Sequence, residues 1–181
     1  MQTFLTVYTP TYKRPQLLER CKQSVANQTL PCQHVIVPDE VGLGVGGMYR
    51  DIQNHAAEVT GDYVLVLSDD NCLHDEDVAL DLSNFVEAEG WPDVVIWRGK
   101  IEGRLYPTER CWNDRRPYEC HIDLSCFAVR SRHWVANADD WPDSYEGDFH
   151  FINKQYERGL TFAWYNRLAY FAMQVSRGAA E

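Results

Sequence analysis

The amino-acid sequence predicts an α/β fold in which a Rossmann-like, mostly parallel central sheet is flanked by helices. Short apolar runs at Phe4–Thr9, His34–Val37 and Tyr63–Leu67 have the length and composition of buried strands. Segments with apolar residues three or four positions apart, as in an amphipathic helix, separate these runs. Because strand and helix alternate over roughly the first 70 residues, we expect parallel strands joined by right-handed helical crossovers.

Two helices are expected between these strands. The first begins at Arg14-Pro15, since proline suits the first turn of a helix. Its apolar face consists of Leu17, Leu18, Cys21 and Val25. The glycine-rich segment Gly42–Gly47 predicts a flexible loop before the second helix. The second helix places on one side Met48, Ile52, Ala56 and Val59.

The second half of the sequence is less regular, and we expect it to form a smaller, mixed part of the fold. The expected elements are, in order, a helix from Asp75 to Gly90, strands at Val94–Trp97 and Ile122–Arg130, a helix within Tyr145–Arg158 that ends at Gly159, and a strand at Thr161–Tyr165. All six tryptophans lie in this half. Tryptophan faces suit the C–H faces of sugars, although most tryptophans in any protein simply pack in the core.

The strand Tyr63–Leu67 is followed by two adjacent carboxylates, Asp69 and Asp70, and by Asn71. In open parallel sheets, ligands gather at the carboxyl ends of the strands. Two neighbouring carboxylates bind an anion poorly unless a divalent cation lies between them, so this pattern indicates Mg²⁺ or Mn²⁺ with a diphosphate. The alternative is an acidic loop before a helix, because Asp75–Asp77 suits a helix N-terminus.

Length and composition restrict the class of protein. With 181 residues, 45% of them hydrophobic, the chain fits one domain over residues 1–181. The net charge of -10 argues against an extended nucleic-acid-binding surface, which needs clustered Lys and Arg. The sequence contains neither a basic leader nor a long apolar segment, so we expect no signal peptide, no transmembrane segment and a cytoplasmic protein.

The glycine-rich segment allows a second interpretation. Gly42, Gly44 and Gly47 satisfy G-x-G-x-x-G after a strand and before a helix, which is the fingerprint of NAD(P)-binding Rossmann oxidoreductases. Asp69 follows at about the spacing of a ribose-binding acid. Against this interpretation, a complete strand and helix precede the motif, whereas the fingerprint normally occupies the first strand-to-helix turn of its unit.

The order of five short motifs is more specific than any one of them. They are Thr9–Pro15, Val35–Asp39, Gly61–Asn71, Ser125–Arg130 and Tyr145–Phe149. In this order they resemble the family 2 glycosyltransferases of GT-A fold, and the resemblance extends from Thr3 to about Tyr165. The sequence departs from the family pattern at Pro38, Ser68 and Gly147, where the family has acidic residues.

The resemblance implies a role for each matching position in nucleotide-sugar binding. The residues implied are Pro10, Thr11, Tyr12, Arg14, Asp39, Arg50, Asp69 and Asp70. Thr11 and Tyr12 would line the base, and Asp39 would accept a hydrogen bond from a uracil-type N–H. The two acids Asp69 and Asp70 would serve the ribose and the metal-bound diphosphate, with the arginine at 50 on the phosphate side.

The resemblance also implies a general base and a metal site. Asp148 would take the proton of the acceptor hydroxyl, and Asp70, Asn71 and His150 would hold Mn²⁺ or Mg²⁺. Simpler alternatives exist for these side chains and for the nucleotide site. Asp148 would cap a helix, His150 would pack or contact the acceptor, and Asp39 would hold a turn.

These assignments predict a metal-dependent glycosyltransferase that moves a sugar from a nucleotide diphosphate, preferentially UDP, to an acceptor hydroxyl with inversion. Residues 1–71 would bind the nucleotide sugar, and residues 72–181 would bind the acceptor and carry the base. The acceptor stays open between a saccharide, a lipid headgroup, a protein and a modified nucleic-acid base. The alternatives are a nucleotidyltransferase, a catalytically silent nucleotide- or sugar-binding module, and the oxidoreductase.

Overall fold

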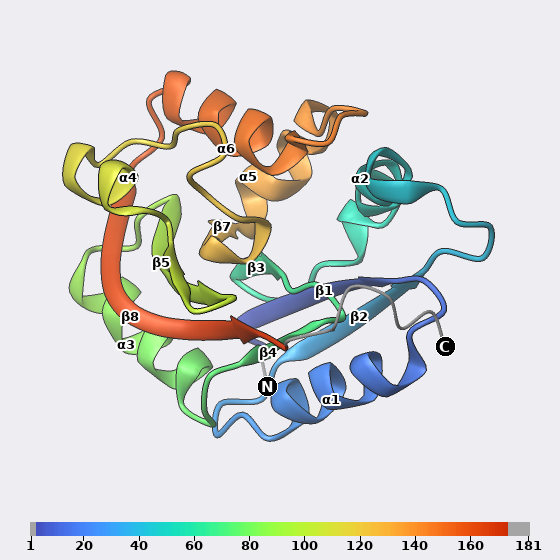
Figure 1. Cartoon of the computed structure of the whole chain (residues 1–181). Coiled ribbons are helices and arrows are strands. Elements are labelled where there is room, and N and C mark those ends of the chain that lie inside the picture. Colours follow the sequence, from blue (N-terminus) through green and yellow to red (C-terminus); the bar gives the residue numbers. More distant parts are fainter. Residues whose placement is uncertain (1–2, 174–181) are drawn as a thin grey trace.

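The computed structural model describes residues 3–173, which form one eight-stranded mixed sheet with helices packed against it (Figure 1). The strands are β1 Leu5–Thr11, β2 Gln33–Pro38, β3 Tyr63–Val66, β4 Asn71–Leu73, β5 Val94–Ile101, β6 Arg104–Tyr106, β7 Phe127–Arg130 and β8 Phe162–Ala172. The helices are α1 Pro15–Ala26, α2 Gly44–Asn54, α3 Val78–Ala88, α4 Glu109–Asp114, α5 Ser131–Ala136 and α6 Gly147–Glu157. The α/β fold with flanking helices is confirmed.

The first three strands are parallel, as the alternating pattern predicts. β1 lies between β2 and β3 and pairs with both in parallel. All three therefore point their carboxyl ends to the same edge of the sheet. The backbone continues this pairing beyond the strands, because Asp39 N–H donates to the Thr11 carbonyl and Leu67 N–H donates to the Tyr8 carbonyl. The carboxyl ends of strands β1, β2 and β3 are thus held side by side.

The second half completes the sheet with mixed pairing. β7 runs antiparallel to both β3 and β5, and β8 runs parallel to β5. β8 is long and strongly curved, and Figure 1 shows it sweeping across the front of the molecule. Its register against β5 shifts around Arg98. The residue after β8 contacts the acid pair, Asp69 and Asp70, because Met173 N–H donates to the Asp70 carbonyl at 2.7 Å.

A stacked group of aromatic rings fills the core between α2, α5 and α6. Trp141 lies parallel to Phe151 with 4.0 Å between ring centroids, and Tyr49 stacks on the other side of Trp141 at 5.0 Å. Tyr8 of β1 stacks on Trp134 of α5 at 5.6 Å. These rings are almost completely buried, so part of the predicted tryptophan-rich half serves the core.

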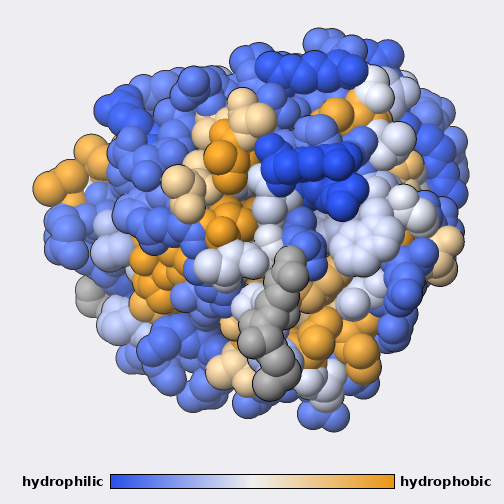
Figure 2. Space-filling view, turned by 180° about the vertical axis from the view of Figure 1, so that it is seen from behind, coloured by the Kyte–Doolittle hydropathy of each residue, from blue (hydrophilic) through white to orange (hydrophobic). Residues whose placement is uncertain are grey.

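Figure 2, which views the molecule from the side opposite to Figure 1, shows a mostly hydrophilic surface with small apolar groups.

Several expected boundaries were wrong. The segment Gly42–Gly47 is not simply a loop, since α2 begins at Gly44 and ends at Asn54. The expected strand Ile122–Arg130 contains a 3₁₀ turn at Leu124–Cys126 and is extended as β7 from Phe127. β4 and β6 were not expected, and β8 is longer than the apolar pattern suggested.

The glycine-rich helix has a physical reason. A Cβ atom at Gly46 would overlap the carboxylate of Asp143, and one at Gly47 would overlap the side chain of Leu43. Glycine at these positions therefore permits close packing within a helix instead of flexibility. Local sequence patterns do not reveal which segment approaches from elsewhere in the chain.

Candidate functional site

A pocket of about 290 Å³ opens where the carboxyl ends of β1 and β2 meet the beginning of α2. It is lined by Pro10, Thr11, Tyr12, Arg14, Val37, Asp39, Gly42, Gly44, Val45, Met48 and Asp51. Five of these residues are among the eight expected to bind a nucleotide sugar. The pocket therefore lies where a parallel sheet usually binds its ligand.

Tyr12 forms one wall of the pocket. A Cβ atom added at Gly42 would lie 2.7 Å from the Tyr12 ring, and Gly42 has a positive φ of 78°. Glycine is therefore required there both for backbone conformation and for the approach of the ring. Tyr12 is 38% exposed, and the Lys13 ammonium lies 4.9 Å from its ring centroid. This ring offers a flat face to a planar ligand.

Asp39 organises the loop that leads into α2. Its carboxylate accepts the backbone N–H groups of Val41, Gly42 and Leu43 at 3.0, 2.7 and 2.6 Å. Burial alone would raise the pKa of Asp39, but these three donors outweigh it and hold the pKa below its ordinary value. The structure thus shows Asp39 in the turn role, with both carboxylate oxygens engaged by the backbone.

The acid pair after β3 is bridged by an arginine. Arg14 Nη2 lies 2.5 Å from Asp69 Oδ1, and Arg14 Nη1 donates to Asp70 Oδ2 at 3.0 Å. Thr11 Oγ donates to the other oxygen of Asp69 at 2.7 Å. Asp69 is fully buried, and burial raises the pKa of its carboxyl. Arg14 therefore supplies the positive charge that two adjacent carboxylates require.

Two of the expected metal ligands have other surroundings in the structure. Asn71 donates its side-chain amide to Ser125 Oγ at 3.0 Å, and His150 is exposed on α6. Residues 3–173 contain no group of three or more His, Cys, Asp or Glu side chains that could hold a metal ion. Asp70 nevertheless has a side chain that is 34% exposed, at the edge of the pocket. One such carboxylate fits a Mg²⁺ or Mn²⁺ ion whose other ligands are substrate phosphates and water.

Asp148 lies in the first turn of α6. Its backbone N–H donates to the Tyr49 hydroxyl oxygen at 3.2 Å, and its Oδ1 accepts the Phe149 N–H at 2.7 Å. Burial, together with the negative charge of Asp123, raises the pKa of Asp148 to about 7. Asp148 is thus a carboxyl group that exchanges its proton near neutral pH.

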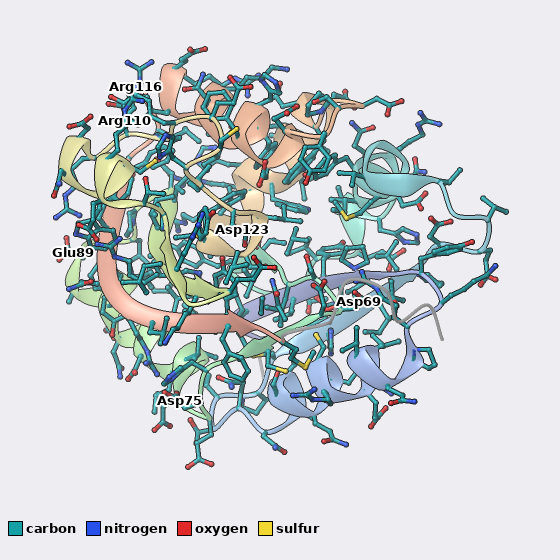
Figure 3. The ribbon with its side chains drawn as sticks, in the orientation of Figure 1. Asp69, Asp75, Glu89, Arg110, Arg116 and Asp123 are labelled. Atoms are coloured by element: carbon teal, nitrogen blue, oxygen red, sulfur yellow. The ribbon has the colours of Figure 1, made fainter. Side chains whose placement is uncertain are left out.

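Asp123 is a site residue that the sequence motifs did not indicate. Its Oδ1 accepts hydrogen bonds from the Tyr170 hydroxyl and from the Ser125 N–H. Burial raises the pKa of Asp123, and the charge of Asp70 raises it further. Asp123 therefore interacts electrostatically with both Asp70 and Asp148, and Figure 3 shows it across from Asp69. Its position two residues before the Ser125–Arg130 motif was the one available signal.

The helix α2 joins the pocket to the loop that precedes Asp148. The Tyr49 ring packs so closely on Gly147 that a Cβ atom there would overlap it. This contact explains why glycine stands at 147, since a larger side chain would displace the ring. Arg50, expected near the phosphates, instead pairs with Asp143 at 2.7 Å and does not line the pocket.

No protein-family model and no curated protein matches this sequence. Solved structures do match. TarS residues 1–349 from S. aureus, in complex with UDP-GlcNAc, has a TM-score of 0.69 at 15% identity, over 96% of this chain and 59% of that one. The mannosyltransferase PcManGT from Pyrobaculum calidifontis, in complex with GDP-Man and Mn²⁺, has a TM-score of 0.70 at 16% identity, over 96% and 58%. This chain has the GT-A glycosyltransferase fold.

The GT-A assignment agrees with the expected fold class in full. The chain spans about three fifths of the two structures named above, and 37% of the longer TarS chain. Within residues 3–173 no helix of this GT-A chain is long and apolar enough to cross a membrane.

Proposed function

We propose that this chain is a glycosyltransferase that moves a sugar from a nucleoside diphosphate to an acceptor hydroxyl. One observation carries the proposal. In a GT-A fold, a nucleotide-sized pocket and an acid pair at the sheet edge occur together with a half-buried carboxyl, Asp148, whose pKa is raised to about 7. A nucleotide-binding module needs the pocket, but it has no use for a carboxyl group tuned to neutral pH.

The nucleotide part of the donor is assigned to the pocket. The base stacks on the exposed face of Tyr12, beside Pro10 and Thr11. The diphosphate lies at Arg14, the one cation among the pocket-lining residues. On donor binding the Arg14 guanidinium exchanges part of its contact with Asp69 and Asp70 for contact with phosphate oxygens. This exchange is feasible because carboxylates and phosphates both accept two parallel hydrogen bonds from a guanidinium.

A divalent cation would be held by Asp70 together with the diphosphate. When bound, Mn²⁺ or Mg²⁺ neutralises the charge that develops on the departing nucleoside diphosphate. The Mn²⁺ in the PcManGT complex supports this assignment. Asn71 is left out of the proposed metal site because its side-chain amide donates to Ser125, and His150 is left out because it is exposed on α6.

The acceptor side is assigned to Asp148. The acceptor oxygen attacks the anomeric carbon, the bond from that carbon to the diphosphate oxygen breaks, and the hydroxyl proton passes to Asp148. A base is most effective when its pKa is near the working pH, which burial and Asp123 provide here. Attack from the side opposite the leaving group inverts the anomeric configuration.

The donor is proposed to carry uridine or guanosine. The two TarS complexes contain UDP-GlcNAc and UDP, and the PcManGT complex contains GDP-Man. Uracil and guanine both offer a ring N–H to an acceptor. UDP is the first choice of the two because the pocket is small. Asp39 can contact that N–H only by sharing an oxygen that already serves the loop backbone.

The test is a panel of UDP, GDP, CDP and ADP with and without Mn²⁺, measured by calorimetry and by melting temperature. Release of nucleotide from the matching nucleotide sugars is then measured on wild type, Asp70→Asn, Asp148→Asn and the control Glu87→Gln, whose carboxylate is exposed on α3. We expect UDP binding that Mn²⁺ strengthens in wild type but not in Asp70→Asn. Transfer should fall by roughly 10² to 10⁴ in Asp148→Asn with donor affinity unchanged. Tight UDP binding with no turnover of any nucleotide sugar would support the silent binding module instead.

A further inference from the structure

A second group of functional side chains lies away from the acid pair, on α4 and the loop that follows it. Arginine side chains there lie over aromatic rings. From guanidinium carbon to ring centroid, the contacts are Arg110 to Tyr118 at 4.0 Å, Arg115 to Trp112 at 4.9 Å, Arg115 to Trp164 at 5.6 Å, Arg116 to Tyr156 at 5.7 Å and Arg116 to Tyr118 at 5.8 Å. We call these three arginines and four rings the arginine–aromatic surface.

The three arginines of this surface are exposed and carry no ion pair within residues 3–173. Their neighbour Arg98, which is buried, differs because Glu109 neutralises it at 2.8 Å. The whole chain has 27 acidic and 17 basic residues, so unpaired cations grouped in one place are unexpected. A guanidinium stacked on a ring keeps its N–H edges free for phosphate oxygens.

A hollow of about 480 Å³ is lined in part by one of these arginines, Arg115. It is lined by Glu89, Arg115, Tyr156, Leu160, Phe162, Ala163 and Trp164. Three partly exposed aromatic rings, Tyr156, Phe162 and Trp164, lie in its wall together with Arg115. The pocket does not share a residue with the nucleotide pocket. Figure 3 shows Glu89, Arg110 and Arg116 at one end of the molecule, with Asp123 lying between them and Asp69 in this view.

The loop after α4 connects this surface to the acceptor side of the site. Asp123 lies seven positions after Arg116, a stretch that spans at most about 25 Å of extended chain. Thr108 holds the loop against the start of α4, because its N–H donates to the His121 carbonyl at 2.9 Å and its hydroxyl bonds His121 Nδ1 at 2.7 Å.

We propose that the arginine–aromatic surface binds a single strand of nucleic acid, with phosphates on its three arginines and one base in the hollow. Alternating cations and ring faces are the elements of sequence-tolerant single-strand binding. A neutral saccharide would leave the three charges unused, and a sulfated polysaccharide would not need the rings. The acid excess of the chain confines this contact to one surface. That the strand also carries the acceptor hydroxyl rests on the proposed glycosyl transfer; the binding itself does not.

The experiment measures fluorescence anisotropy of a labelled 12-nucleotide single strand between 50 and 200 mM salt. Three phosphate contacts on a single strand predict a slope of log affinity against log salt of about -2. The double variant Arg115→Ala/Arg116→Ala should bind at least about tenfold more weakly at 50 mM salt, with a slope reduced to about -1. The control Arg20→Ala/Lys22→Ala removes the same charge from exposed positions on α1 and should bind like wild type.

A second variant separates stacking from charge and guards against loss of folding. Arg115→Lys/Arg116→Lys keeps both charges but loses the planar stack, so it should keep the salt slope and lose affinity. Circular-dichroism melting and UDP calorimetry are run on every preparation, so failure of nucleotide binding is seen separately. Equal loss of binding in the α1 control, no binding at 50 mM salt, or tighter binding of heparin than of the oligonucleotide would each overturn the proposal.

Discussion

The raised pKa of Asp148 predicts how the transfer rate depends on pH. With a pKa of about 7, about a tenth of the Asp148 carboxyls are ionised at pH 6 and about nine tenths at pH 8. A general base must be ionised before it can accept a proton, so kcat/KM should fall about tenfold per unit below pH 6 and level off above pH 8.

Removing the neighbouring charge should move this profile. In Asp123→Asn the carboxylate that raises the pKa of Asp148 is gone, whereas the amide oxygen can still accept from Tyr170 and Ser125. The pKa of Asp148 should fall, and the acidic limb of kcat/KM should shift to lower pH. The assay is initial transfer rate from pH 5 to 9 at fixed donor concentration. Asp139→Asn, which removes an exposed carboxylate, is the matched control.

Two results would refute this reasoning. An acidic limb in the same place for wild type and Asp123→Asn would show that Asp123 does not set the pKa of the base. A limb that persists in Asp148→Asn would show that another group titrates. Since burial is the larger cause of the raised pKa, part of the elevation should remain in Asp123→Asn.

Three further predictions follow from other contacts. Arg14→Ala leaves the Asp69 and Asp70 carboxylates without their cation, so calorimetry without nucleotide should show tighter Mn²⁺ binding than in wild type, while UDP binds more weakly. Tyr49→Phe keeps the ring but removes the oxygen that accepts the Asp148 N–H, and transfer should fall roughly two- to tenfold at unchanged UDP affinity. Asp148→Asn should melt at a higher temperature than wild type at pH 8 and at the same temperature near pH 4. The folded pKa of about 7 lies above the ordinary 3.8, so ionisation opposes folding increasingly as pH rises between these values.

The parts of the fold that the sequence predicted are those set by local patterns. β1, β2 and β3 are short apolar runs, and the residues after them are polar because they face the edge of the sheet. The family resemblance assigned Thr11, Tyr12 and Asp39 to nucleotide binding, and these three residues line the pocket at those strand ends.

The parts that were missed depend on segments far apart in the chain. β4 exists because it pairs with the end of β8, about 100 residues later. Asp123 becomes a site residue because Tyr170 and Ser125 hold it beside Asp148. The hydrophobic periodicity of a single sequence does not reveal contacts between segments so far apart in the chain. In the same way, nothing in the local sequence shows that His150 faces solvent.

Gly46 and Gly147 allow α2 to approach the segment that leads into α6. α2 lines the nucleotide pocket with Gly44, Val45 and Met48, and the next residue, Tyr49, contacts the first turn of α6, which carries Asp148. Glycine is needed at 46 and at 147, since a Cβ atom there would overlap Asp143 or the Tyr49 ring. The helix that lines the proposed donor pocket is therefore also the helix that contacts the proposed base.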